Sequence, residues 1–154
     1  MAEIGEKAPS FTLPRDAGGE VSLSGYAGQN VVLFFYPKDN TPGCTKEAID
    51  FTTDQPAFEA ANTVVIGLSK DSVKKHDNFV AKHDLGVILA SDADSDVCEQ
   101  YGVWKEKSMY GKKFLGIERS TFLIDAEGKL AHIWPKVRVK GHVDAVLEAA
   151  RALS

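Results

Sequence analysis

Cysteine is scarce in this sequence, with two residues among 154. Two cysteines cannot build the disulfide framework of a small secreted domain. They lie far apart, and no pair of cysteine or histidine residues has the short spacing typical of zinc ligands. The sequence therefore argues against a disulfide scaffold and gives no reason to expect a bound metal or another cofactor.

An excess of basic residues and long apolar runs are absent as well. Lys and Arg number 18 against 22 Asp and Glu, a net charge of −4, so neither nucleic acid nor an anionic membrane is expected as a partner. Residues 1–7 have no apolar core for a signal peptide, and no window approaches membrane-spanning length. We therefore expect a cytoplasmic protein, in a compartment that keeps thiols reduced.

The length and the 44% content of hydrophobic residues fit a single domain covering residues 1–154. Apolar runs at 31–36, 64–68 and 87–89 show no polar alternation, which indicates strands buried on both faces of a sheet. Further strands are expected in two hairpins, one at 11–13 and 20–23 and one at 118–124 and 129–133.

Helices are expected between these strands, at 42–53, from Asp71 or Ser72 to 83, at 94–101 and at the C-terminus. Pro56 should end or kink the first of them. This order predicts an α/β, thioredoxin-like fold, in which helices flank a central mixed β-sheet and a β-hairpin precedes it. Residues 105–113 are predicted to form an exposed loop.

Cys44 occupies a position that suits a nucleophile. It follows the apolar run 31–36 and stands where a helical pattern begins, so it should face unpaired backbone N–H groups and the positive end of the helix dipole. An ordinary thiol with a pKa of ~8.5 is only ~3% ionised at pH 7. A helix start stabilises an anion by ~0.3 to 1 kcal/mol and at best ~2 kcal/mol, less than the ~3.4 kcal/mol that a shift of ~2.5 units needs. A neighbouring cation is therefore expected.

The spacing Pro37-x-x-x-Thr41-x-x-Cys44 resembles the active-site signature of the peroxiredoxins. The longer run over 36–48 is similar to the bacterioferritin comigratory protein branch of that family, also called the Q type. Segments that fit the same branch follow in order along the chain, at 9–14, 67–71, 98–104 and 116–125. The resemblance covers essentially the whole sequence and implies a thiol-dependent peroxidase with antioxidant function, acting on hydrogen peroxide and organic hydroperoxides.

The resemblance also implies roles for individual residues. Arg119 would be the cation beside the Cys44 thiolate. The Thr41 hydroxyl, the backbone N–H groups of Gly43 and Cys44, and the Arg119 guanidinium would polarise the peroxide. The Pro37 ring would shield the oxidised sulfur from water.

Simpler roles exist for several of these residues. Thr41 could cap the helix, and Pro37 could merely end a strand. Glu47 could orient Thr41 or Arg119, or it could be a solvent-facing helical carboxylate. Two histidines at 76 and 83 are expected on a solvated helix face.

The second half of a peroxidase cycle needs a thiol that reduces the oxidised cysteine. In relatives of this branch a resolving cysteine stands at the positions of Ile49 or Val80 here. The remaining thiol, Cys98, is expected to be a core residue without a redox role. The chain thus resembles a one-cysteine peroxiredoxin, reduced by thioredoxin, glutaredoxin or glutathione, with a monomer expected and a dimer as the alternative.

Two other classes of protein compete with this interpretation. A dithiol oxidoreductase would need Cys-x-x-Cys, but Thr41 occupies the first cysteine position, so its intramolecular disulfide cannot form and this class is disfavoured. A noncatalytic binding or holdase module on the same fold stays open, because fold does not fix function. Peroxide consumption with an added thiol separates the two.

Overall fold

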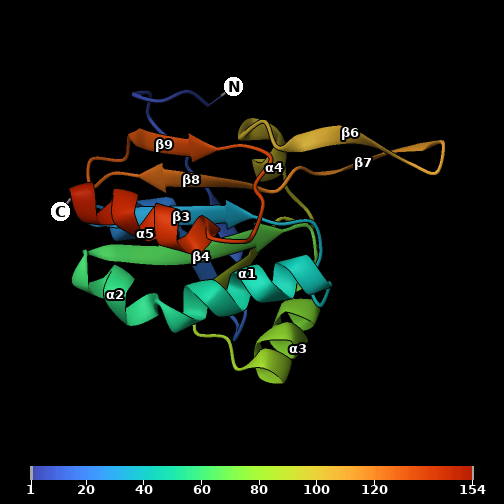
Figure 1. Ribbon diagram of the computed structural model, residues 1–154, viewed down its shortest axis with the longest axis horizontal. Helices are drawn as coiled ribbons and strands as arrows, with labels where there is room; N and C mark the ends of the chain where they lie inside the picture. The colour runs from blue at the N-terminus through green and yellow to red at the C-terminus, as the bar shows by residue number, and fades with distance from the viewer. Residues whose placement is uncertain (1, 154) are drawn as a thin grey trace.

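The computed structural model describes residues 2–153, and Figure 1 shows them arranged around one central sheet. The sheet has five strands in the order β5-β4-β3-β8-β9. Their bounds are β3 Asn30–Phe35, β4 Thr63–Ser69, β5 Ile88–Ser91, β8 Ser120–Ile124 and β9 Leu130–Trp134. β3, β4 and β5 are parallel, whereas β8 runs antiparallel to both β3 and β9. The predicted mixed sheet is confirmed.

The helices are α1 Pro42–Thr53, α2 Gln55–Ala60, α3 Val73–His83, α4 Val97–Gln100 and α5 His142–Leu153, with a 3-10 turn, η1, at Leu23–Tyr26. Pro56 lies in the first turn of α2, where its missing N–H costs nothing, and α1 ends just before it. The N-terminal hairpin pairs β1 Thr12–Pro14 with β2 Glu20–Ser22. No helix among the described residues is both long enough and apolar enough to cross a membrane.

Every residue of β3 is buried, and its side chains alternate between two hydrophobic cores. Phe35 lies in the core that β1, β2 and α4 cover, and Phe34 lies in the core that α1, α2, α3 and α5 cover. The two cysteines are divided in the same way. Cys98 belongs to the first core and Cys44 to the second, so the sheet separates the two thiols.

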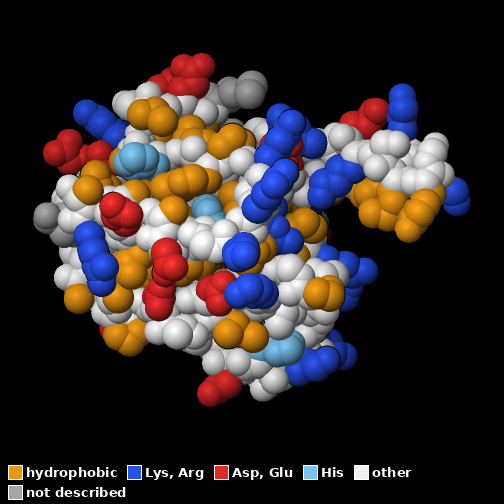
Figure 2. Space-filling model, in the orientation of Figure 1, with side chains coloured by type: hydrophobic (Ala, Val, Ile, Leu, Met, Phe, Trp, Pro, Cys, Tyr) orange, Lys and Arg blue, Asp and Glu red, His pale blue; other side chains and the backbone are white. Residues whose placement is uncertain are grey.

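Residues 105–113 do not form the predicted loop. They belong to a hairpin of β6 Trp104–Met109 and β7 Lys112–Ile117, which projects from the body of the molecule (Figure 1). Its two-residue turn, Tyr110 and Gly111, has φ of +53° and +77°, as a tight hairpin turn requires. The prediction was wrong because this arm buries little beyond its base: Met109, Tyr110, Phe114 and Leu115 are exposed, and Figure 2 shows hydrophobic side chains on the underside of its tip.

The helix predicted at 94–101 is shorter, with α4 beginning only at Val97. The buried carboxylate of Asp92 accepts the backbone N–H groups of Val97 and Cys98, at 3.1 and 2.8 Å. These bonds fix the preceding turn and satisfy two donors at the helix start.

Candidate active site

Cys44 lies in the first turn of α1, immediately beyond the carboxyl end of β3. The N-cap residue Thr41 is extended, with φ −87° and ψ 152°, and Pro42 follows at the first helical position. N–H groups in a first helical turn have no partner within the helix and carry the positive end of its dipole. Cys44 is 1% exposed, so its sulfur lies in a largely dry environment.

Arg119 reaches this sulfur although it is 75 positions away in the sequence. Ser120, the next residue, pairs with Phe35 at the end of β3, which brings Arg119 to the edge of the sheet where α1 starts. Its Nη2 donates to Cys44 Sγ at 3.2 Å. The structure therefore brings a guanidinium directly against the thiol.

Glu47 holds the other side of the guanidinium. It lies one turn after Cys44 on α1, and Arg119 Nη1 donates to its Oε1 at 2.7 Å. The Glu47 side chain is fully buried, so the solvent-facing alternative is wrong. Burial raises the pKa of Glu47 to about 7, although the charge of Arg119 opposes the shift. Among the described residues, nothing hydrogen-bonds its Oε2.

Gly43 gives the guanidinium room to approach. A Cβ at this position would lie 3.2 Å from Arg119 Nη2, closer than almost all real Cβ contacts. The absence of a side chain at Gly43 thus has a steric role beside Arg119, which the sequence did not indicate.

Thr41 and Pro37 lie on the loop that joins β3 to α1. The Thr41 hydroxyl donates to the carbonyl of Lys38 at 2.8 Å and makes no capping bond to α1. Pro37 is exposed at the end of β3. Neither side chain hydrogen-bonds Cys44 within the described part of the chain.

Lys107 adds a second basic group, from the middle of β6 in the β6–β7 arm. Its stem passes over Gly116, where the Cβ of any other residue would stand 3.4 Å from Lys107 Cδ. Partial burial and then the charge of Arg119 lower the pKa of Lys107, while Cys44 acts in the opposite direction. The predicted loop therefore contributes to the electrostatics of the site.

Cys98 is in the opposite environment. Its side chain is fully buried on the other face of the sheet, beside the carboxylate of Asp92. Burial, followed by the charge of Asp92, raises the pKa of the Cys98 thiol far above its usual range. Such a thiol is a poor redox partner.

His76 is not on a solvated face as predicted. It is fully buried, with its ring between Asp39 and the carbonyl of Ala90, whereas His83 is half-buried and stacks edge-on against Phe79. The signal for this was available, because His76 stands three residues before Phe79 and four before Val80, on the apolar side of α3.

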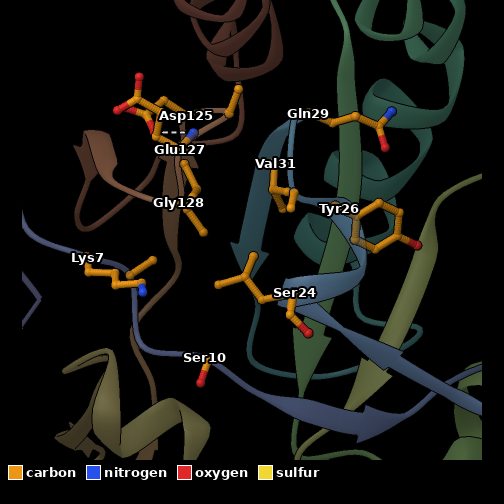
Figure 3. Close-up of a pocket in the computed structure, with 14 residues that line it drawn as sticks. Lys7, Ser10, Ser24, Tyr26, Gln29, Val31, Asp125, Glu127 and Gly128 are labelled. Carbon is orange, nitrogen blue, oxygen red and sulfur yellow. Dashed lines mark hydrogen bonds between the residues drawn. The ribbon is translucent and has the colours of Figure 1, made fainter.

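A separate hollow lies at the far end of the sheet, where β3 starts and β8 ends (Figure 3). Its volume is about 530 Å³, and its walls include Val31, Tyr26 and Lys7. None of the residues around Cys44 lines it. Among the described residues no cluster of His, Cys, Asp or Glu is arranged to hold a metal ion.

A thioredoxin-like sheet that presents a cysteine at a helix start to an arginine defines a thiol-based redox protein. The sequence matches the AhpC/TSA family over residues 4–133. It is 49% identical to peroxiredoxin Bcp of Bacillus subtilis, over 99% of this chain and 97% of that protein, and 43% identical to peroxiredoxin Bcp of Escherichia coli K12, over 94% and 93%. The chain therefore belongs to the AhpC/TSA family, and within it to the Bcp peroxiredoxins.

Solved structures agree with this assignment. The bacterioferritin comigratory protein of Xanthomonas campestris superposes with a TM-score of 0.90 at 46% identity, covering 99% of this chain and 97% of that one. Peroxidoxin BcpB of Mycobacterium tuberculosis gives a TM-score of 0.87 at 33% identity, covering 100% and 99%. The predicted family and thioredoxin-like fold are confirmed.

Proposed function

We propose that this protein is a thiol-dependent peroxidase whose nucleophile is Cys44. The observation that carries the proposal is the 3.2 Å contact from Arg119 Nη2 to Cys44 Sγ at the start of α1. The guanidinium is a charged donor placed against the sulfur of a residue in a first helical turn, where negative charge is stabilised as the reaction proceeds. The peroxiredoxin Bcp relatives support the same reaction class.

In the first step the Cys44 thiolate attacks one oxygen of a hydroperoxide. An S–O bond forms, the O–O bond breaks, and the leaving oxygen takes a proton to become water or an alcohol. Negative charge moves onto that oxygen as the bond breaks, so fixed donors lower the barrier. Arg119 and the backbone N–H groups of Gly43 and Cys44 are the donors, and Thr41 orients the peroxide once its hydroxyl turns from Lys38.

Glu47 keeps the guanidinium in place from the side opposite the sulfur, and Pro37 covers the entrance beside the thiol. Organic hydroperoxides are included as substrates because the related Xanthomonas campestris protein is described by its alkyl peroxide reduction activity. The product on the enzyme is the Cys44 sulfenic acid.

Reduction of the sulfenic acid requires a thiol from outside the chain. Ile49 and Val80 carry no thiol, and Cys98 lies across the sheet from Cys44. One external thiol condenses with the sulfenic acid, releases water and leaves a mixed disulfide, and a second thiol then restores Cys44 and departs as a disulfide. Thioredoxin, glutaredoxin and glutathione are the proposed reductants, with the cytoplasm as the location and a monomer as the working form.

Peroxide consumption in the presence of a reducing thiol tests the proposal. Cys44→Ser should abolish turnover, whereas Cys98→Ala should leave it near the wild-type rate. Activity of Cys44→Ser above a few per cent would rule out Cys44 as the nucleophile. A wild-type protein that consumes no peroxide with any of the three reductants would instead favour the noncatalytic holdase.

A further inference from the structure

The loop that joins β3 to α1 has one buried charged side chain, which follows the buried Tyr36. Between β3 and α1, Pro37, Lys38 and Asn40 are exposed, whereas Asp39 is 7% exposed. Asn40 adopts a left-handed conformation with φ +63°, which costs free energy unless neighbouring contacts impose it. Asp39 is therefore the anchor that holds this loop against the protein.

Three elements bind Asp39. The Tyr36 hydroxyl donates to its Oδ1 at 2.6 Å, from the end of β3. Its own backbone N–H donates to Asp71 Oδ2 at 2.8 Å, beyond the end of β4. His76 Nδ1, on α3, lies 2.6 Å from its Oδ2. The contact with His76 is the one that ties the loop to a helix outside the active site.

The ring of His76 has an acceptor at each nitrogen. Nε2 lies 2.9 Å from the carbonyl oxygen of Ala90 on β5, which can only accept, so Nε2 carries a proton. Nδ1 faces a carboxylate whose other oxygen already accepts from Tyr36. Both nitrogens are therefore donors, and the pair is an imidazolium and a carboxylate in a fully buried site.

The surrounding charges favour this form. Burial lowers the pKa of His76, but the hydrogen bond and the charge of Asp39 outweigh burial, with smaller help from Ala90 and Asp71, so the pKa is raised. The facing titratable groups are Asp39 on the loop, Tyr36 just after β3, and Asp71 beyond β4. Two uncharged residues hold Asp71 in place: the Ser69 hydroxyl donates to its carboxylate and the Ser91 hydroxyl donates to its backbone carbonyl.

We infer that His76 is a positioning residue for the peroxidase, acting through its ion pair with Asp39 to fix the loop that presents Pro37 and Thr41 to Cys44. The inference rests on the proposed function. Thr41 is the N-cap of α1 and stands three residues before Cys44, so a shift of the loop moves the donors around the sulfur. Misplacement of such groups by about 1 Å can cost a hundredfold in rate.

His76→Gln tests the inference, with His83→Gln on the same helix as the matched control. The second-order rate constant for the reaction of Cys44 with hydrogen peroxide is measured well below the unfolding transition. We expect His76→Gln to slow it at least about tenfold and His83→Gln to leave it within about twofold. An unchanged rate for folded His76→Gln would overturn the inference, while an inactive wild type would overturn the proposed function instead.

Two readouts separate positioning from stability alone. Iodoacetamide alkylation needs only the thiolate, so at neutral pH His76→Gln should change it less than about twofold while the peroxide rate at the same pH falls. The folded pKa of His76 is raised, so the ion pair is complete below about pH 6.5 and is lost as pH rises through the folded value. The peroxide rates of wild type and variant should therefore converge at alkaline pH, and parallel profiles would contradict the role.

Tyr36→Phe is the milder variant if His76→Gln does not fold. It removes one hydroxyl from Asp39 and keeps the aromatic packing of the ring, and we expect a peroxide rate about threefold to tenfold lower. Nitrogen NMR of wild-type His76 checks the ionisation directly. A neutral ring at pH 6, or a Tyr36→Phe rate equal to that of the wild type, would overturn the inference.

Discussion

Gly43→Ala separates stability from reactivity, because the same change affects the two in opposite directions. Alanine stabilises a helix interior by about 1 kcal/mol relative to glycine, and somewhat less in the first turn. Gly43 is not among the residues with positive φ, so its backbone accepts a side chain. We expect the free energy of unfolding to stay unchanged or to rise by up to about 1 kcal/mol.

The reaction rate should fall, because the new Cβ would stand 3.2 Å from Arg119 Nη2 and 3.9 Å from its Cζ. Nonbonded contacts become favourable near 3.5 Å, so the guanidinium must withdraw by roughly 0.3 Å. Glu47 holds Nη1 at 2.7 Å, so the withdrawal mainly stretches the 3.2 Å contact with Cys44. Losing about half of a charge-assisted hydrogen bond worth ~1.5 to 3 kcal/mol slows the reaction about threefold to tenfold.

Stopped-flow measurement of the peroxide step and urea unfolding provide the two numbers. Gly25→Ala is the control, because a Cβ there meets nothing within 4 Å and its φ is not in the left-handed region. A Gly43→Ala protein that reacts at the wild-type rate would show that Arg119 does not depend on this close approach. A loss of stability larger than about 1 kcal/mol would show that the backbone, rather than the guanidinium, absorbs the clash.

Three other changes test the remaining parts of the site. Arg119→Met should slow the peroxide step by at least about a hundredfold, because it removes the charged donor 3.2 Å from the sulfur, with the exposed Arg138→Met as control; an unchanged rate would remove Arg119 from the site. Glu47→Gln should flatten the pH dependence of stability: because burial raises the pKa of Glu47 to about 7 from an ordinary 4.5, the folded state binds this proton more tightly, and the free energy of unfolding falls as pH rises across that window. If the free energy of unfolding, measured with urea at several pH values, changes equally with pH in the wild type and in Glu47→Gln, the prediction is contradicted. Cys98→Ala should leave the products on Cys44 unchanged, namely sulfenic acid, sulfinic acid with excess peroxide, and a mixed disulfide with glutathione; a Cys44–Cys98 linkage in the wild type, found by mass spectrometry, would refute the one-cysteine mechanism.

Features with a local pattern could be predicted from the sequence. The uninterrupted apolar run at 31–36 indicated a buried strand, and the helix after it placed Cys44 in a first turn, as observed. Arg119 was different, because no local pattern distinguishes it from a surface arginine. Its approach depends on the pairing of β8 with β3, and only the resemblance to a family indicated it.

Features that depend on a distant partner escaped prediction. Glu47 and His76 are charged or polar residues on helices, where solvent is the usual neighbour. Each is buried because a group more than 30 positions away binds it, Arg119 in one case and Asp39 in the other. The loop prediction for residues 105–113 failed for the opposite reason. The strands of the β6–β7 arm pair with each other but bury little, so they lack the alternation of polarity by which strands are recognised.

The two cysteines differ in one physical variable that governs the reactivity of a thiol, the charge of its nearest neighbour. Both side chains are buried, at 1% exposure for Cys44 and none for Cys98, so access to solvent does not distinguish them. Their charged neighbours do. Cys44 receives a hydrogen bond from the Arg119 guanidinium, whereas the backbone of Cys98 donates to the Asp92 carboxylate, whose charge opposes ionisation of the thiol. In the proposed mechanism a thiolate is the nucleophile, so the sign of the nearest charge would select Cys44, and the sheet between the two cores would keep Cys98 from intercepting its oxidised form.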